Sequence, residues 1–359
     1  MPMLSLYQRL LRRRYENETL ADEIHRVPTT DGLRVALKRF LPNDDVERRH
    51  LPVLLVPGLG ADSHNFDAPA PIGLAPYLAE HGFDTFVVDL RGTGLSHVPR
   101  ERWSQVCFDD FLQLDVPAVD EKIQQLTGRH QRLHLGHSMG GMLLYAAMAT
   151  GRAGHIKAGV TVGTPVGFPH RWQVAPLLRP FRHLGEWVPG LFMRDMSRLV
   201  TPLLTLSDRW PGLNTYVELS NMEPKMAQQL LFQAVQDIPR ALLLQFRDWV
   251  EHDAFRSQNH DVDYRAQLMG TQTPVLAVAG PADKLGTPKA VERICGLSSN
   301  VEYMLCGKAQ GFSADYGHAD LLLGAPSRDE VFPKLLDFLV RHDDDAKETT
   351  STTSHLRVL

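Results

Sequence analysis

Ser138 is the residue in this chain best placed to do covalent chemistry. It is the centre of the pentapeptide G-H-S-M-G at residues 136–140, with a short apolar segment before it and a helical pattern at 138–150 after it. A sharp strand-to-helix turn strains its central residue and needs glycines where strand and helix approach closely. The pattern therefore predicts a serine nucleophile exposed above a sheet. The alternative is a serine that only caps an ordinary helix.

A serine hydroxyl becomes a good nucleophile when a base accepts its proton. The chain has 16 histidines, but chain order narrows the choice, because in turns of this kind the serine is followed first by an acid and then by the histidine. Beyond the last strand pattern, at 301–305, lie His318, His342 and His355, and of these His318 follows the strand in a glycine-marked loop. We predict that His318 is the base.

The acid that orients the base should also follow a strand. Asp283 comes just after the apolar segment at 275–279 and lies between the serine and the histidine in the chain. We therefore predict that Asp283 fills this role. Asp315 and Asp320 are minor alternatives, because they are too near His318 in the sequence to orient its ring easily.

Attack on a carbonyl group creates an oxyanion, which needs two preorganised N–H donors. One donor should be the backbone N–H of Met139, directly after the nucleophile. The other should come from the glycine-rich loop at 58–60, after the apolar segment at 52–56, and we assign it to the N–H of Leu59. Because a backbone donor requires no particular side chain, this oxyanion-hole assignment depends on position alone.

Apolar segments that end in glycine-containing loops alternate with helical patterns along the chain. The expected strands are 52–56, 85–89, 133–135, 158–162, 275–279 and 301–305, after a hairpin at 24–42. Such alternation predicts an α/β fold, with a mostly parallel central sheet flanked by helices. Since functional side chains in these folds gather at the carboxyl ends of the strands, the candidate residues should meet at one edge of the sheet.

The alternation stops near residue 166 and resumes near 274. The segment between them has no strand pattern, and Pro224 and Pro239 are typical of helix starts. Its aromatic side chains, which either line a cleft or form the segment's own core, include Trp172, Trp187, Trp210 and Trp249. We expect four parts: an N-terminal amphipathic segment (1–23), an α/β core (24–165 and 271–342), a helical cap (166–270) and a disordered tail (343–359).

Composition excludes several classes of function. The 359 residues are 43% apolar and 22% charged, as in globular proteins, and the net charge of −4 gives no basic field for nucleic acid. Three scattered cysteines suit neither a disulfide framework nor a cysteine-rich zinc site, and they indicate a reducing compartment such as the cytoplasm. His130, His134 and His137 have metal-like spacing, but the first two straddle a strand start. We expect no metal and no cofactor.

Leucines alternate with arginines near the N-terminus, between Leu4 and Arg14. An amphipathic helix of this kind fits two situations. It could lie on an anionic lipid surface as a peripheral membrane contact, or it could pack on its own domain, which is the commoner situation. No apolar run in the chain approaches the ~18 residues of a membrane span. The oligomeric state is left open.

Together these motifs resemble the α/β-hydrolase superfamily over about residues 25–341. The matching features are P-G-L-G at 57–60, D-L-R-G-T-G-L-S at 89–96, the serine pentapeptide, and Asp283 and His318 in that order. The segments at 61–66 and 315–320 are similar, more loosely, to acid lipases and to lipase-like relatives of polyhydroxyalkanoate synthases. Two departures are Pro57, where many members have a histidine, and Ser138, where the polymer synthases use cysteine.

The resemblance implies a cofactor-free serine hydrolase that cleaves carboxylic esters of hydrophobic acyl groups, as lipases and esterases do. Ser138 would form the acyl-enzyme, with His318 and Asp283 completing the catalytic triad. An acyltransferase or thioesterase with the same three residues is the alternative, because only the acyl acceptor or donor would differ.

Overall fold

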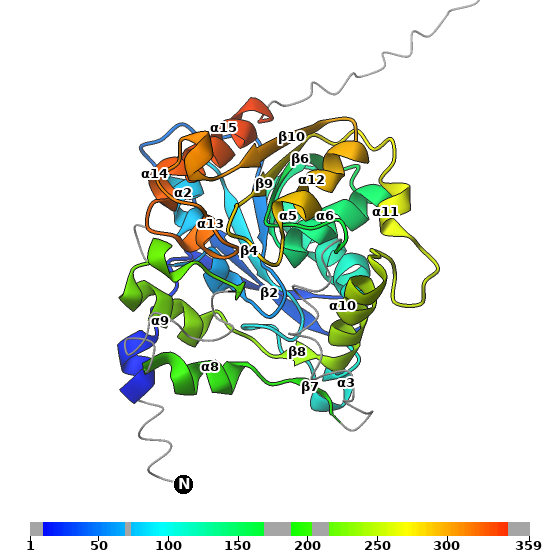
Figure 1. Ribbon diagram of the computed structural model, residues 1–359, viewed down its shortest axis with the longest axis horizontal. Coiled ribbons are helices and arrows are strands. Elements are labelled where there is room, and N and C mark those ends of the chain that lie inside the picture. The colour runs from blue at the N-terminus through cyan, green and yellow to red at the C-terminus, as the bar shows by residue number, and fades with distance from the viewer. Residues whose placement is uncertain (1–9, 69–72, 169–187, 203–214, 344–359) are drawn as a thin grey trace, which may run out of the picture.

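An eight-stranded sheet runs through the centre of the computed structural model, which describes residues 10–68, 73–168, 188–202 and 215–343 (Figure 1). Its strands are β1 (Glu23–Pro28), β2 (Arg34–Phe40), β3 (Val53–Val56), β4 (Thr85–Asp89), β5 (Arg132–His137), β6 (Ile156–Val162), β9 (Val275–Ala279) and β10 (Val301–Leu305). Their order in the sheet is β1-β2-β4-β3-β5-β6-β9-β10. Neighbouring strands in the series β4, β3, β5, β6, β9 and β10 are parallel. The predicted α/β fold is confirmed.

The hairpin expected at 24–42 is formed by β1 and β2, which pair antiparallel. At its turn the N–H of Gly32 donates to the carbonyl of Thr29 at 3.0 Å, and Gly32 has a φ of +83°, which glycine adopts without strain. Strand β2 then joins the parallel strands through an antiparallel pairing with β4. The hairpin therefore extends one edge of the sheet.

Alternate side chains of β3 enter two separate cores, one on each face of the sheet. Leu54 and Val56 belong to one apolar cluster, while Val53 and Leu55 belong to the other. Helices α5 (Val116–Thr127) and α6 (Met139–Ala149) cover the first face, and α2 (Leu74–Glu80) and α15 (Phe332–Arg341) cover the second. Each fully buried Leu or Val contributes about 1.5–3 kcal/mol to folding. This double cover explains the uninterrupted apolar strands.

A long insertion separates β6 from β9. Its described elements are β7 (Gly190–Leu191), α8 (Arg194–Val200), η6 (Leu219–Asn221), α9 (Pro224–Gln233), β8 (Ile238–Pro239), α10 (Arg240–His252) and α11 (Tyr264–Gln267). Of the two prolines that the sequence analysis marked, Pro224 is the first residue of α9, and Pro239 directly precedes α10 as its N-cap. The antiparallel pair β7–β8 was not expected, because two residues per strand are too short to leave a pattern.

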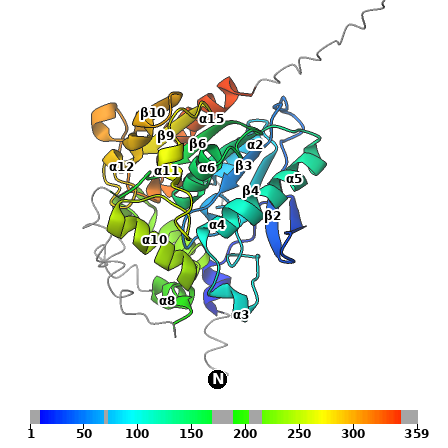
Figure 2. The same cartoon turned by 90° about the vertical axis from the view of Figure 1, so that its right-hand side faces the viewer.

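Helices α8 and α10 of the insertion lie below the central sheet in Figures 1 and 2, whereas α11 lies beside α6. An isolated bridge between Val235 and Ala61 joins the insertion to the loop after β3. Trp249 of α10 is fully buried against Phe108 of the core, at a ring-centre distance of 5.1 Å. It therefore holds the insertion to the domain. Trp172, Trp187 and Trp210 lie outside the described residues.

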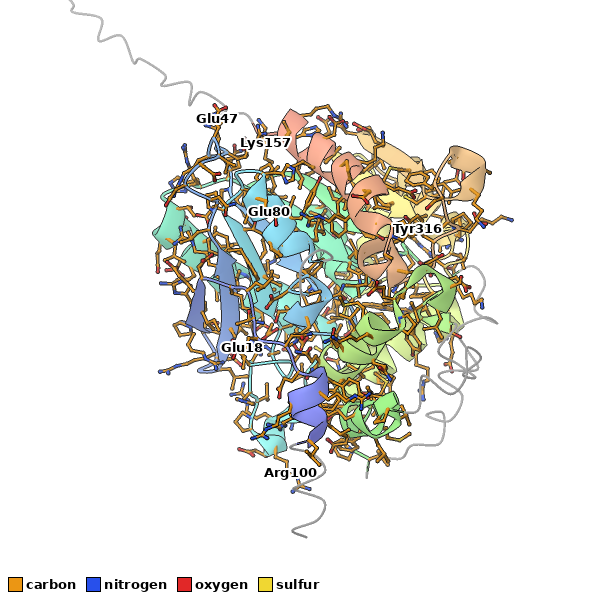
Figure 3. The ribbon with its side chains drawn as sticks, turned by 90° about the vertical axis from the view of Figure 1, so that its left-hand side faces the viewer. Glu18, Glu47, Glu80, Arg100, Lys157 and Tyr316 are labelled. Carbon is orange, nitrogen blue, oxygen red and sulfur yellow. The ribbon has the colours of Figure 1, made fainter. Side chains whose placement is uncertain are left out.

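The N-terminal segment packs on this insertion. Residues 10–15 are helical, and Leu11 and Tyr15 bury their side chains against Phe232 of α9 (Figure 3, dark blue beside green). The side-chain amide of Gln233 donates to the carbonyl of Asn17 at 3.1 Å. Of the two situations expected for this amphipathic helix, packing on its own domain is therefore present.

The chain leaves the core after α15. Asp343, which the sequence analysis placed in the tail, is buried and accepts the N–H groups of His50 and Leu51 at 3.1 and 2.8 Å. The rest of the expected tail, 344–359, lies outside the described residues. None of the helices in the described part of the chain is long and apolar enough to cross a membrane.

Candidate active site

Ser138 lies at the turn between β5 and α6 in a strained conformation, with φ 52° and ψ −116°. Side-chain-bearing residues rarely adopt a positive φ, and such strain is concentrated at functional sites. Glycine is needed beside it, because a Cβ on Gly136 would lie 2.2 Å from the nitrogen of Gly141. The side chain of Ser138 makes no capping hydrogen bond to the described α6, which disfavours the simple N-cap alternative.

His318 and Asp283 are brought together from the loops after β10 and β9. Nδ1 of His318 lies 2.8 Å from Oδ2 of Asp283, and both side chains are buried. The other carboxylate oxygen accepts the N–H groups of Leu285 and Gly286, each at 2.8 Å. With Nδ1–H donated to Asp283, Nε2 of His318 carries the lone pair that can accept a proton.

The two alternative acids, Asp315 and Asp320, have other hydrogen-bond partners. Asp315 accepts the backbone N–H of Lys308 at 2.9 Å. Asp320 accepts the N–H of Gly317 at 2.8 Å and a side-chain N–H of Asn221 at 2.7 Å. In the described part of the chain the imidazole ring of His318 hydrogen-bonds to the carboxylate of Asp283 and to neither of these two. The geometry therefore favours Asp283.

Gly163 shows how tightly this pair is enclosed. The residue directly follows β6 with a φ of +60°, and a Cβ on it would lie 3.0 Å from Nδ1 of His318 and 3.1 Å from Oδ2 of Asp283. A side chain here would displace one of the two partners. The sequence analysis did not single out this glycine, although its place directly after an apolar strand was a usable signal.

The loop after β3 passes directly over the nucleophile. A Cβ on Gly58 would lie 3.1 Å from Cβ of Ser138, so Leu59 follows at the mouth of the site. Met139 follows Ser138 as the first residue of α6, and Leu59 lines the same cavity as Ser138. The assignment of their N–H groups as oxyanion donors stays a prediction.

Gln236 of the insertion anchors this loop, although no local sequence pattern pointed to this residue. Its backbone N–H donates to the carbonyl of Gly60 at 2.8 Å. Its side-chain amide donates to Oδ2 of Asp62 at 2.7 Å and accepts the N–H of Gly94 at 3.3 Å. Gln236 is 3% exposed, so these bonds are shielded from water. One buried side chain therefore connects the insertion to two loops of the core.

Asp89, at the end of β4, also holds the loop that follows β3. Its two oxygens accept the N–H groups of Ser63 and Leu95, each at 2.8 Å. Burial, reinforced by the nearby charge of Asp62, raises the pKa of Asp89. A Cβ on Gly94 would lie 2.3 Å from Oδ2 of Asp89. This carboxylate therefore has a structural role in the D-L-R-G-T-G turn.

The histidines with metal-like spacing have other partners. Nε2 of His134 lies 3.1 Å from the carbonyl oxygen of Gly140, and His137 lies between Asn65 and the carbonyl of His318. Burial lowers the pKa of both buried histidines to about 3. Within the described ranges, no cluster of three or more His, Cys, Asp or Glu side chains could hold a metal ion.

A cavity of about 520 Å³ opens above Ser138 and His318, which both line it. Volumes of roughly 300–1,000 Å³ are typical of ligand sites. The rest of the lining is mostly apolar and comes largely from the insertion; it includes Leu191, Met193, Val217, Leu230, Ile238 and Phe246. The arrangement can therefore place an apolar group next to a serine and an oriented imidazole.

A family model for the alpha/beta hydrolase fold matches residues 52–325. The chain belongs to the α/β-hydrolase family. Among curated proteins, triacylglycerol lipase 1 of Arabidopsis thaliana is 23% identical over 88% of this chain and 86% of its own length. Lipase member N of Mus musculus is 22% identical over 73% and 72% of the two chains.

Solved structures share the fold. An esterase from Thermogutta terrifontis superposes with a TM-score of 0.61 at 16% identity, over 90% of this chain and all of the esterase (100%). A monoglyceride lipase variant from Saccharomyces cerevisiae gives 0.59 at 17% identity, over 92% and 98% of the two chains. The lipase and esterase relatives point to a carboxylic ester hydrolase.

Proposed function

We propose that this α/β hydrolase is a serine esterase or lipase that cleaves carboxylic esters of hydrophobic acyl groups through an acyl-enzyme on Ser138. The observation that carries the proposal is the cavity that Ser138 and His318 share, whose remaining lining is mostly apolar. Its supports are the strained turn at Ser138 and the 2.8 Å contact between His318 and Asp283.

The mechanism follows from this geometry. Nε2 of His318 takes the proton of Ser138 as the serine oxygen attacks the ester carbonyl, and Asp283 stabilises the imidazolium that forms. The N–H groups of Leu59 and Met139 hold the oxyanion. The imidazolium then gives its proton to the departing alcohol. Water, deprotonated by the same histidine, releases the acid from the serine.

We further propose that the insertion acts as a cap that receives the acyl chain. The apolar cavity lining comes largely from its elements, for example Leu191 of β7, Leu230 of α9 and Phe246 of α10. Burial of apolar surface contributes about 25 cal/mol per Å². A hydrophobic acyl group would bind there, while a charged one would lose its hydration without a partner.

A fluorophosphonate probe tests the nucleophile. We expect it to label Ser138 in the full chain, and Ser138→Ala to lose both labelling and hydrolysis of p-nitrophenyl butyrate. Roughly 10³–10⁴-fold acceleration over water should survive through the oxyanion hole and substrate binding. Labelling of another serine would contradict the assignment. Addition of an acceptor alcohol, or a thioester in place of the ester, distinguishes an acyltransferase or thioesterase with the same triad.

We also propose a peripheral lipid contact through the N-terminal helix. One face of this helix packs on Phe232, which leaves Leu10, Arg12, Arg13 and Arg14 exposed. Exposed arginines beside an apolar side chain suit an anionic membrane surface. The chain should sediment with anionic vesicles more than with neutral ones. Equal sedimentation by the variant Arg12→Glu/Arg13→Glu would refute this contact.

A cytoplasmic location fits the cysteine chemistry. Cys107 and Cys306 are buried free thiols, and Cys295 is an exposed one. Unpaired thiols are typical of reducing compartments. Fractionation of cells that express the full chain tests this proposal, and recovery from the secreted fraction would contradict it.

A further inference from the structure

His137, the residue before the nucleophile, is buried between two other loops of the site. Its Nε2 lies 3.1 Å from the main-chain oxygen of His318, and its Nδ1 lies 3.1 Å from the side-chain oxygen of Asn65. The rings of His137 and His318 are 4.7 Å apart at their centres. Asn65 ends η1 (Ser63–Asn65), on the loop that carries Leu59. His137 thus joins the three segments that hold the oxyanion loop, the nucleophile and the base.

The protons in this chain of contacts follow from a donor count. Both ring nitrogens of His137 face oxygen atoms, yet a neutral imidazole has only one N–H. Burial, together with the charge of His318, lowers the pKa of His137 to about 3, so that the ring is neutral at neutral pH. At the same time Nδ2 of Asn65 is buried and has no hydrogen-bond partner among the described residues. One contact is therefore unmatched and one donor is unused.

A half-turn of the Asn65 amide resolves both problems, because the oxygen and nitrogen of an amide have nearly the same shape. Nδ2 of Asn65 then donates to Nδ1 of His137. The proton of His137 moves to Nε2, which donates to the carbonyl oxygen of His318. A buried donor without any partner costs about 1–3 kcal/mol, and this arrangement gives Nδ2 of Asn65 a partner while matching both ring nitrogens of His137.

We propose that Asn65 and His137 are positioning residues that fix the main chain of His318 relative to Ser138 through these two hydrogen bonds. The proposal rests on the proposed function, in which His318 is the base. Asp283 holds the imidazole ring from one side, and His137 holds the backbone of the same residue. A misplacement of about 1 Å can lower a rate 10²-fold. Two points of attachment prevent the base from tilting away from the serine.

The tautomer of His137 is the first test, and it needs no substrate. Nitrogen NMR of the full chain, labelled with ¹⁵N-histidine, distinguishes Nδ1–H from Nε2–H, and the signal missing in His137→Gln assigns the resonances. We expect Nε2–H, unchanged between about pH 5 and 8, because the ring does not titrate there. An Nδ1–H tautomer, or a titration in this range, would overturn the proposal even if the protein hydrolyses esters.

Substitutions at His137 are the second test. His137→Leu removes the donor, whereas the side-chain amide of His137→Gln can donate to the same carbonyl. His137→Leu should lower kcat for p-nitrophenyl butyrate, and the rate of fluorophosphonate labelling, on the order of 10- to 100-fold with little change in KM. His137→Gln should stay within several-fold of the wild type. Equal losses in both variants, at equal Tm, would make the role merely structural.

Substitution of Asn65 provides a test that does not depend on whether His137→Leu folds. Asn65→Leu alone should lower kcat. Where His137→Leu folds, the double variant Asn65→Leu/His137→Leu should be no slower than His137→Leu alone, because the two residues act as a unit. Additive losses would contradict the chain of bonds. The matched control is His342→Leu at the end of α15, whose Nδ1 also faces a carbonyl, that of Phe338 at 2.9 Å. A wild type that neither labels nor hydrolyses would refute the proposed function, while the tautomer would still be measurable.

Discussion

Oδ2 of Asp283 lies 2.8 Å from Nδ1 of His318, while its other oxygen is held by the N–H groups of Leu285 and Gly286. The carboxylate is therefore fixed before it meets the histidine. An ionised carboxylate can accept a hydrogen bond but cannot donate one, so Nδ1 of His318 must carry the proton. Asp283 thus selects the tautomer with a free lone pair on Nε2. The position of one carboxylate thus decides whether His318 can act as a base.

Asp283→Asn tests this relation directly. The amide oxygen can still accept the two backbone N–H groups, so its NH₂ group must face Nδ1 of His318. The ring would then carry its proton on Nε2 and could not accept one from Ser138. We expect kcat to fall on the order of 10⁴-fold, with Tm nearly unchanged. Asp315→Asn is the control and should stay near wild type; the reverse pattern would assign the acid to Asp315.

How far could the sequence predict this site? Ser138, His318 and Asp283 have local signatures, because the pentapeptide and the strand ends are contiguous in the chain. The parallel sheet was predictable for the same reason, since each strand is a short apolar run. The gathering of these three residues then follows from the fold, because parallel strands end at one edge of the sheet.

Other contacts could not be predicted, because they join residues far apart in sequence. Gln236 and Asp62 are separated by 174 positions, and His137 and His318 by 181. A glutamine in a helical segment carries no local sign of its partner. The histidine inside the pentapeptide stands at a position where the motif allows any residue type, so its presence draws no attention. Such roles become visible only when the loops are placed together.

Gln236→Leu tests the connection between the insertion and the oxyanion loop. The substitution leaves Oδ2 of Asp62 without its 2.7 Å donor and lets the loop that contains Leu59 shift. Loss of one buried charged-group hydrogen bond costs about 1.5–3 kcal/mol. We expect a lower Tm and a fall in kcat on the order of 10-fold. Gln229→Leu on α9, which removes the hydrogen bond to the side chain of Asn17 in the N-terminal segment, should lower Tm without changing kcat. A wild-type kcat for Gln236→Leu would argue against the connection.

The buried histidines predict acid sensitivity of the fold. Burial lowers the pKa of His134 to about 3, against ~6.5 in an unfolded chain. Below about pH 6.5 the unfolded state therefore binds a proton that the native state does not, so the free energy of unfolding falls as pH falls, by about 1.4 kcal/mol per pH unit, until about pH 3. His137 acts in the same direction.

Urea unfolding at pH 7 and pH 5 measures this effect. One such histidine should account for about 2 kcal/mol of the difference between the two pH values. His134→Gln cannot titrate, and its amide can still donate to Gly140, so the variant should lose that share of the pH dependence whatever its stability at pH 7. An unchanged difference between pH 7 and pH 5 would mean that His134 is protonated in the native state.

The last prediction concerns the acyl chain. The cavity of about 520 Å³ is lined mostly by apolar side chains, and each buried methylene contributes about 0.8 kcal/mol, or roughly fourfold in kcat/KM. Esters of medium or long chains should therefore be better substrates than acetates, until the cavity is full. A steady fall in kcat/KM from acetate upward would instead indicate a small site beneath a self-packed insertion.

A matched pair of leucines shows whether the insertion is responsible. Leu191 lines the cavity, whereas Leu199 on α8 is 62% exposed and does not. Leu191→Asp places a charge where the acyl chain would lie, and an unpaired charge in an apolar site is strongly unfavourable. It should lower kcat/KM for octanoate and longer esters far more than for acetate, so that the chain-length preference disappears. Leu199→Asp should keep the preference. If both variants keep it, the acyl chain binds elsewhere and the cap has no part in choosing the substrate.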